Sequence, residues 1–272
     1  MDATHHQKID GESHPPLWGQ PHMELQPKES SLFRQAIESL KDFLPEAQLC
    51  INEQGLTISG MDASHVGFAK YFLAAADCGV LKVPIPLTLG VPLGTLSRIL
   101  ASMGSNDQLV ISSNDTHLVI TATSDKTKKK TKGEAPLLDL TVDALEIPET
   151  IYAGNLKAKT ADLATACKEV GAFGDSLNFF MDDDGFHVSA KSELGSMTQT
   201  LENIGDDRDM EFTAELARPV GFGTKYITGM LKCGVSSHVS LGFDETQPMR
   251  LVFNYGQGSS LIFHLAPKMH DD

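Results

Sequence analysis

Apolar residues along the chain follow two spacings in turn, and this order repeats four times. The windows 32–44, 92–103, 160–171 and 219–234 place apolar residues three and four positions apart, as on one face of a helix. Each window precedes two short runs in which apolar and polar residues alternate around a turn, which is typical of an antiparallel hairpin. The pattern predicts four units, each a helix followed by two strands.

The four units form two similar halves. The turn glycines Gly55 and Gly185 occupy equivalent places, and helices one and three, and helices two and four, have a similar offset. We therefore expect two copies of one α+β domain, each of about 125 residues with two helices and an antiparallel sheet. The expected boundaries are a flexible N-terminal extension at 1–22, an N-terminal domain at 23–136, a connector at 137–153 and a C-terminal domain at 154–272.

Composition narrows the class of protein. With 272 residues and 41% hydrophobic content the chain can bury a substantial core. No apolar run approaches the roughly 20 residues that cross a bilayer, and the first 22 residues lack the apolar stretch of a signal peptide, so an intracellular protein is expected. The four cysteines are scattered without a CxxC pair, which favours buried thiols over disulfides. The histidines near the N-terminus fit no metal-site spacing, and no cofactor is expected.

Charge is unevenly distributed. The net charge of −14 argues against a protein that simply coats nucleic acid. The four helical windows nevertheless hold six basic residues against four acidic ones, whereas the rest of the chain holds 16 against 32. Each helix alone could be an ordinary solvated face, but the shared bias favours a surface for a polyanion that is recognised through its phosphates. The six cations are Arg34, Lys41, Arg98, Lys168, Lys225 and Lys232.

Six motifs occur in a fixed order: "LKDFLPEA", "GMDASHV", "LTLGVPLGTLSRIL", "LDLTVDALEIPE", "SELG" and "LIFHLAPKM". In order and spacing, from about residue 23 to 270, they resemble the proliferating cell nuclear antigen (PCNA) family of sliding clamps. The resemblance implies the DNA clamp fold and a homotrimeric ring whose helices line a central channel around double-stranded DNA, without sequence preference. It also implies a polymerase processivity factor with no enzymatic activity of its own, opened by an ATP-driven clamp loader.

The resemblance also implies two sets of site residues. The six cations and Lys82, in the strand before the second helix, match basic positions that face DNA in the family. Partner proteins of the family insert a short peptide with an aliphatic and two aromatic anchors into a groove under the connector. Matching groove positions are Met61, His65, Val66, Leu145, Ile147, Pro148, Tyr152, Pro248, Leu265, Ala266 and Pro267. Without the motifs, core packing would explain several of these apolar residues equally well. Subunit contacts would come from edge strands near 128–136 and 194–202.

Departures from the family pattern mark a divergent member. Gln35, Ala101 and Thr165 stand where the family often has Lys or Arg, so the channel should be less basic than usual. Asp183 replaces a lysine that many eukaryotic members modify, and His264 replaces an aromatic residue of the groove. The lysine run 126–132 and the N-terminal extension are additions that point to a virus or a distant eukaryotic lineage. The expected location is the nucleus, or the site of viral DNA replication.

Two hypotheses from other classes remain. An enzyme could use the "DDDG" segment at 182–185 as a metal site, or Asp62 with His65 as a catalytic pair, but GxGxxG, P-loop, HExxH and GxSxG motifs are all missing from the sequence. The chain could instead be an interaction subunit of a heterotrimeric checkpoint-type clamp, or a scaffold that never encircles DNA. Oligomeric state distinguishes these from a homotrimer.

Overall fold

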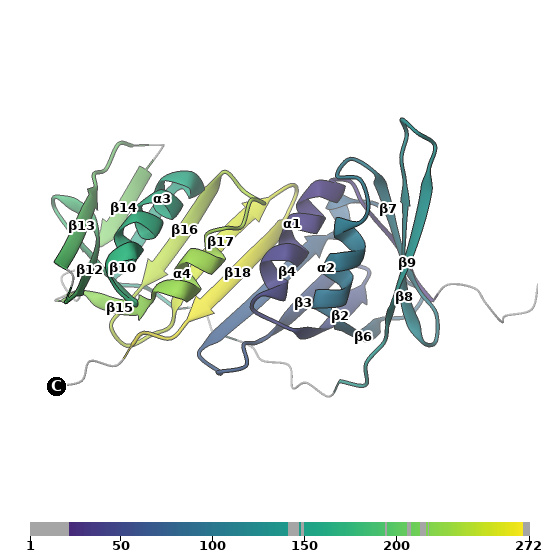
Figure 1. Cartoon of the computed structure of the whole chain (residues 1–272), viewed down its shortest axis with the longest axis horizontal. Coiled ribbons are helices and arrows are strands. Elements are labelled where there is room, and N and C mark those ends of the chain that lie inside the picture. The colour runs from purple at the N-terminus through teal and green to yellow at the C-terminus, as the bar shows by residue number, and fades with distance from the viewer. Residues whose placement is uncertain are drawn as a thin grey trace, which may run out of the picture.

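The computed structural model describes residues 22–140, 147, 150–193, 195–205, 208–212, 216 and 218–268. The two halves of the chain run through the same series of elements (Figure 1). The first half consists of β1 (Glu24–Pro27), α1 (Ser30–Lys41), β2 (Glu46–Asn52), β3 (Gly55–Met61), β4 (Gly67–Ala74), η1 (Ala75–Asp77), β5 (Cys78–Lys82), β6 (Leu87–Pro92), α2 (Leu93–Ala101), β7 (Gln108–Ser113), β8 (His117–Thr123) and β9 (Lys130–Pro136).

In the described residues the second half repeats this order of strands and α-helices, but its short 3-10 helix η2 follows α3, whereas η1 follows β4. It consists of β10 (Gly154–Lys159), α3 (Thr160–Val170), η2 (Gly171–Phe173), β11 (Ser176–Asp182), β12 (Gly185–Ser192), β13 (Gly195–Leu201), β14 (Arg208–Phe212), β15 (Val220–Gly223), α4 (Thr224–Met230), β16 (His238–Phe243), β17 (Met249–Tyr255) and β18 (Ser259–Leu265). Two similar α+β halves of antiparallel sheet with two helices each, as the sequence predicted, are therefore the observed fold.

The sheets repeat as well as the elements. The first half contributes a five-stranded sheet in the order β5-β1-β7-β8-β9, and its remaining strands follow the order β4-β3-β2-β6. The second half has the equivalent orders β14-β10-β16-β17-β18 and β13-β12-β11-β15. β18 pairs with β4 in an antiparallel ladder from Ser260↔Phe72 to Leu265↔Gly67. This ladder, which we call the internal joint, merges two of the four sheets into one nine-stranded sheet.

The four helices lie together on one side of the molecule (Figure 1). In α1 the residues Phe33, Ala36, Ile37 and Leu40 are buried, which is the apolar face that the sequence predicted. The fourth predicted window, 219–234, was too long. Val220–Gly223 forms strand β15 beside β11, and α4 covers only Thr224–Met230. Two glycines in this short segment disfavour a helix there.

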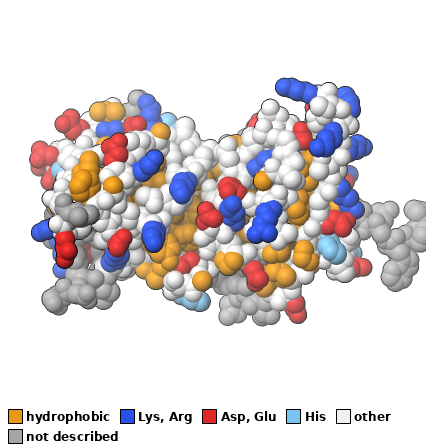
Figure 2. Space-filling model, viewed as in Figure 1, with side chains coloured by type: hydrophobic (Ala, Val, Ile, Leu, Met, Phe, Trp, Pro, Cys, Tyr) orange, Lys and Arg blue, Asp and Glu red, His pale blue; other side chains and the backbone are white. Residues whose placement is uncertain are grey.

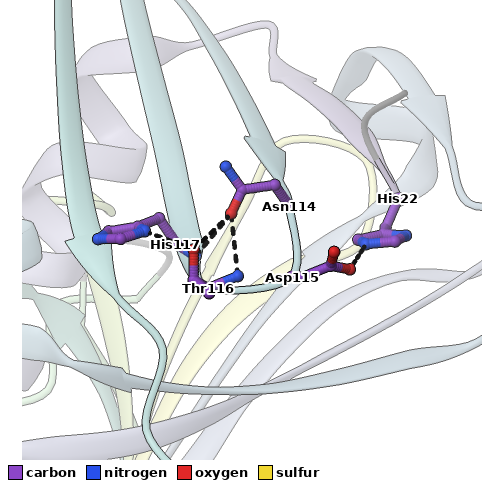
Figure 3. A network of polar contacts seen from close by, with 5 residues as sticks. All are labelled: His22, Asn114, Asp115, Thr116 and His117. Carbon is purple, nitrogen blue, oxygen red and sulfur yellow. Dashed lines mark hydrogen bonds and ion pairs between the residues drawn. The ribbon is translucent and has the colours of Figure 1, made fainter. Parts of the chain in front are cut away.

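Glycine and Asx turns close the hairpins at the places that the sequence indicated. Gly55 (φ +145°) and Gly185 (φ +137°) begin β3 and β12, and a Cβ at either would lie 2.0 Å from Leu73 O or 2.4 Å from Leu201 O. Only glycine fits this conformation at that distance from a neighbouring strand. In the β7–β8 turn Asn114 Oδ1 accepts hydrogen bonds from the N–H groups of Thr116 (3.0 Å) and His117 (2.8 Å) (Figure 3).

The start of the connector follows β6. Leu138 N–H donates to Gly90 O (2.9 Å), and the Gln48 side-chain amide donates to Leu140 O (2.8 Å). β9 and β13 each form an edge of their sheets and lie at opposite ends of the molecule (Figure 1). In the part of the chain that the structure describes, no helix has the length and apolar character needed to cross a membrane.

Candidate functional site

The helix-bearing face carries most of the cations that the sequence singled out. Lys and Arg side chains gather on it between scattered acidic ones (Figure 2). Two clefts bring residues of both halves together there. Lys41 and Lys225 line a cleft of about 520 Å³ with Asp42 and Tyr226, and Arg34 and Lys232 line another of about 730 Å³. Cations that are far apart in the sequence therefore share one surface.

Arg34 is held by α2 and is only partly available to a ligand. Its Nη1 donates to Leu100 O and to Met103 O (3.3 Å), at the C-terminal end of α2. The pKa of the Arg34 guanidinium is lowered because its burial outweighs the negative charge of Asp107, which alone would raise the pKa. A cation at a helix C-terminus stabilises the helix through the last carbonyls and the dipole. The family resemblance implied a DNA-facing place for Arg34, and the structure adds a helix-capping contact that residue spacing alone could not reveal.

Lys41 is paired within its own helix. Its Nζ lies 2.6 Å from Glu38 Oε1, and this hydrogen bond raises the pKa of the Lys41 ammonium group. Ser97 Oγ, on α2, donates to the other oxygen of the same carboxylate. Glu38 therefore neutralises part of the charge of α1, and a phosphate would have to compete with it for Lys41.

The other four cations of the predicted helical windows are more available to a ligand than Arg34 and Lys41. Arg98, Lys168, Lys225 and Lys232 are exposed, and in the described part of the chain none of them is bonded to a carboxylate. Lys232 lies just beyond the end of α4, contrary to the expectation that it shares a helix with Lys225. Lys82 ends β5, with β6 still between it and α2, and its Nζ lies 3.6 Å from Glu24.

The loop 62–67 is organised by the carboxylate of Asp62, which is only 6% exposed. Asp62 accepts hydrogen bonds from the backbone N–H groups of Ser64 (3.0 Å), Val66 (2.9 Å) and Gly67 (2.7 Å). Tyr226 of α4 donates its hydroxyl to Asp62 Oδ2 (2.8 Å), so the loop of the first half is bonded to a helix of the second. Burial alone would raise the pKa of Asp62, but these hydrogen bonds outweigh it and the pKa is lowered.

Tyr226 is the residue that sequence inspection missed here. Its ring makes an edge contact with Phe43 (centroids 5.8 Å apart), which in turn packs on Phe263 of β18. An aromatic residue beside Lys225 on a short helix gives no signal of a hydrogen bond to a loop 164 residues away. Only the fold brings the two together.

Several of the predicted groove residues meet beside this loop. Ala266 N–H donates to Val66 O (2.9 Å), and Leu265 pairs with Gly67 and with Met249, which follows Pro248. Val66 and His65 are exposed, and His65 has a left-handed backbone (φ +56°). Met61, at the end of β3, and Pro267, after β18, are half-buried at the same place.

The connector side of the predicted groove lies only partly within the described residues. Tyr152 is buried against Gly242 of β16, where a Cβ would lie 2.4 Å from its ring. Ile147 is half-buried. Leu145 and Pro148 lie outside the described residues, so nothing is added to the expectation for them.

His264 lies on β18 opposite Arg250 of β17 and Phe68 of β4. It is 9% exposed, its ring centroid is 6.1 Å from that of Phe68, and its Nδ1 has no hydrogen-bond partner among the described residues. Burial, with the charge of Arg250 adding to it, lowers the pKa of His264 to about 4. The imidazole is therefore neutral near pH 7.

The residues considered for catalysis make contacts that organise their own turns. Asp62 holds its own loop, and no hydrogen bond joins its side chain to that of His65 in the described part of the chain. In "DDDG", Asp182 Oδ1 lies 2.7 Å from His187 Nε2 and accepts from Asp184 N–H, as in an Asx turn. Within the described ranges no group of three or more His, Cys, Asp or Glu side chains could hold a metal ion.

Comparison with known proteins identifies the family. The model of the PCNA N-terminal domain matches residues 22–145, and the model of the PCNA C-terminal domain matches residues 146–268. The chain is 25% identical over 257 residues to the proliferating cell nuclear antigen of Chaetomium thermophilum, with 92% of this chain and 99% of that protein covered. Its fold is similar to the crystal structure of PCNA from Entamoeba histolytica, with a TM-score of 0.82 and 23% identity over 92% of this chain and 100% of that one. These matches span nearly all of the described chain, which therefore belongs to the PCNA family of DNA sliding clamps.

Proposed function

We propose that this chain closes head to tail with two further copies into a homotrimeric ring around duplex DNA, and that the ring acts as a polymerase processivity factor. It does no chemistry itself and depends on an ATP-driven clamp loader for opening. Its place of action is the nucleus, or the site of viral DNA replication. The number of copies is the one that the family resemblance implies.

The observation that carries the proposal is the equivalence between the internal joint and the free edges of the chain. β9 is the counterpart of β18, and β13 is the counterpart of β4, in the repeated sheet orders. Since β18 and β4 pair within the chain, pairing β9 of one copy with β13 of the next would repeat the same joint between copies. Head-to-tail contacts of this kind form rings when the rotation closes, and they use up exposed strand edges.

The helix-bearing face would then line the channel. Arg98, Lys168, Lys225 and Lys232 offer exposed cations for phosphates, whereas Arg34 and Lys41 are partly engaged within the chain. Few phosphate contacts suit a ring that must slide, because each neutralised phosphate adds salt-dependent binding affinity. Tighter binding would hinder sliding along the DNA. Topological closure, and not tight ion pairing, would keep the protein on DNA.

The groove beside the loop 62–67 would receive polymerase and other partners through a short peptide with aliphatic and aromatic anchors. Val66 and Ala266 supply adjoining apolar surface, Leu265 is buried beside them, and Ile147 would close the groove from the connector. Calorimetry with such a peptide should show binding to the wild type and its loss in Ile147→Ser, because a polar side chain removes apolar contact area. Equal affinities would contradict this groove assignment.

Oligomeric state is the first test of the ring. Native mass spectrometry at micromolar concentration should give three times the 29.4 kDa chain mass. The protein should also stimulate a cognate polymerase on primed circular DNA, and the double variant Lys41→Glu/Lys225→Glu should abolish that stimulation while remaining trimeric. A purely monomeric protein would refute the homotrimer.

One observation favours a second candidate, an interaction subunit of a heterotrimeric checkpoint-type clamp or a scaffold that does not encircle DNA. The engagement of Arg34 and Lys41 weakens the predicted channel. A chain that stays monomeric alone but forms a stoichiometric complex with other clamp-like chains would support this alternative.

A further inference from the structure

The hairpin between β8 and β9 carries the densest positive charge of the described chain, and the clamp function does not account for it. Five of the seven residues 126–132 are lysine, in a protein of net charge −14. The last ladder pair of the hairpin is Thr123↔Lys130, so residues 124–129 form a tip beyond the strands and outside the β9 edge that would pair with the next copy. Figure 1 shows this hairpin rising past the ends of the helices, and Figure 2 shows Lys or Arg side chains gathered there.

The tip has a defined backbone that does not depend on its lysine side chains. Ser124 N–H donates to Lys129 O (2.9 Å), and Thr127 N–H donates to Ser124 Oγ (3.3 Å). Lys128 adopts a left-handed conformation (φ +54°) that turns the chain. The lysines can therefore be changed without removing the contacts that close the turn.

The ammonium groups of the tip are free to bind an anion. Lys126, Lys128 and Lys129 are exposed, and in the described ranges none of them is paired with a carboxylate. Farther down the hairpin, Lys132 is paired with Glu134 (2.5 Å). The tip thus differs from α1, whose terminal lysine is neutralised by Glu38.

The chemistry of the tip points to phosphates and not to an acidic peptide. Peptide and protein partners are usually anchored by aromatic, arginine or apolar side chains that fill pockets. The residues 124–129 offer only Lys, Thr, Ser and Asp, with no apolar anchor among them. Hydrated lysine charges and hydroxyl donors are what a repeating phosphate backbone accepts without sequence readout.

We propose that this tip binds the phosphate backbone of duplex DNA outside the channel, through Lys126, Lys128 and Lys129. The position of the DNA rests on the proposed clamp function, whereas the affinity of the tip for phosphates does not need a closed ring. The tip compensates for the cations of α1 that are engaged within the chain. It gives the protein a second point of contact on the DNA that it encircles.

The experiment compares two variants with the same change in net charge. Lys126→Gln/Lys128→Gln/Lys129→Gln removes the tip charges and leaves strand β9 unchanged. The matched control Lys70→Gln/Lys157→Gln/Lys191→Gln removes three exposed lysines from β4, β10 and β12. Fluorescence anisotropy with a short duplex, at several salt concentrations, gives the slope of log affinity against log salt.

Each lost phosphate contact should reduce that slope by about 0.9, so the tip variant should lose up to about 2.7 and bind more weakly at low salt. The control should keep the wild-type slope, and Lys126→Arg/Lys128→Arg/Lys129→Arg should restore it. An unchanged slope in the tip variant, or equal losses in tip variant and control, would overturn the proposal. So would polyglutamate of matched charge competing better than DNA for the tip.

Native mass spectrometry on the same samples separates this inference from the ring. A trimer whose salt slope does not change in the tip variant would refute DNA binding by the tip and leave the proposed ring standing. A monomer whose salt slope still depends on the tip lysines would refute the ring and support DNA binding by the tip.

Discussion

The hydrogen bond between Tyr226 and Asp62 joins the helix-bearing face to the loop 62–67, and its removal tests how that loop is held. Tyr226→Phe deletes the hydroxyl that lies 2.8 Å from Asp62 Oδ2 and keeps the ring that packs on Phe43. The substitution therefore removes one polar contact between the halves and leaves the aromatic packing.

The expected cost follows from the burial and charge of Asp62. A hydrogen bond to a charged group contributes roughly 1.5–3 kcal/mol. Asp62 is 6% exposed but keeps three backbone N–H donors, so it is not left unsatisfied. We therefore expect the lower part of the range, about 1.5–2 kcal/mol of unfolding free energy.

Urea unfolding at fixed protein concentration measures this cost, because any self-association makes stability depend on concentration. Hydrogen exchange adds a local readout: the amides of Val66 and Gly67 should exchange faster in the variant, since Asp62 is their acceptor. A double-mutant cycle with Asp62→Asn isolates the pair, and its coupling energy should exceed about 0.5 kcal/mol.

The pH dependence has a definite sign. The pKa of Asp62 is lowered in the folded chain, so its ionised form adds stability above its unfolded pKa of about 3.9, and this stability is lost as the pH falls through the folded value. Tyr226→Phe should raise the folded pKa, and the difference between wild type and variant should narrow below about pH 4. A coupling energy near zero, or a difference that stays constant with pH, would refute the reasoning.

Three further predictions address single residues. Arg34→Gln should lower the urea midpoint of unfolding by removing the cap of α2, at a cost of about 0.5–2 kcal/mol. Arg98→Gln should instead weaken DNA binding and leave stability unchanged. The reverse pattern would show that Arg34 acts only in DNA binding. For His264, the folded pKa of about 4 lies below the unfolded value of 6.5, so the free energy of unfolding should fall by up to about 3 kcal/mol as the pH drops from 6.5 to 4. His264→Phe should abolish this pH-dependent loss, which urea unfolding at pH 7 and pH 4.5 measures. Gly185→Ala should destabilise the chain by more than 1 kcal/mol because of its positive φ and the 2.4 Å approach to Leu201 O, whereas Gly229→Ala in α4, with open space around it, should be neutral or stabilising in thermal melts.

Much of the fold was predictable because its signals are local. The apolar stripe of α1, the turn glycines and the alternation of β7 and β8 each follow from residues close in sequence. The length of α4 was not predictable from the sequence, because Val220 and Phe222 suit a helix face or a strand equally. Their pairing with β11 makes this segment a strand. The pairing of β4 with β18 likewise depends on a contact between distant parts of the chain that no short window contains.

The site was predictable in outline and not in its internal contacts. Residue types and motif order indicated the candidate cations and groove residues. Whether a given cation is free depends on neighbours from other elements, as Arg34 with Leu100 and Lys41 with Glu38 illustrate. The hydroxyl of Tyr226 found its acceptor only through the fold.

The internal joint also has a mechanical consequence. Because β18 and β4 are neighbours in one sheet, the boundary between the two halves is as continuous in hydrogen bonding as the interior of the sheet. Bending the chain there would stretch a ladder of six residue pairs and pull Tyr226 from Asp62. The two halves are also covalently continuous, whereas copies paired edge to edge through β9 and β13 would be held by non-covalent contacts alone. In such an assembly the contacts between copies would therefore separate before the internal joint.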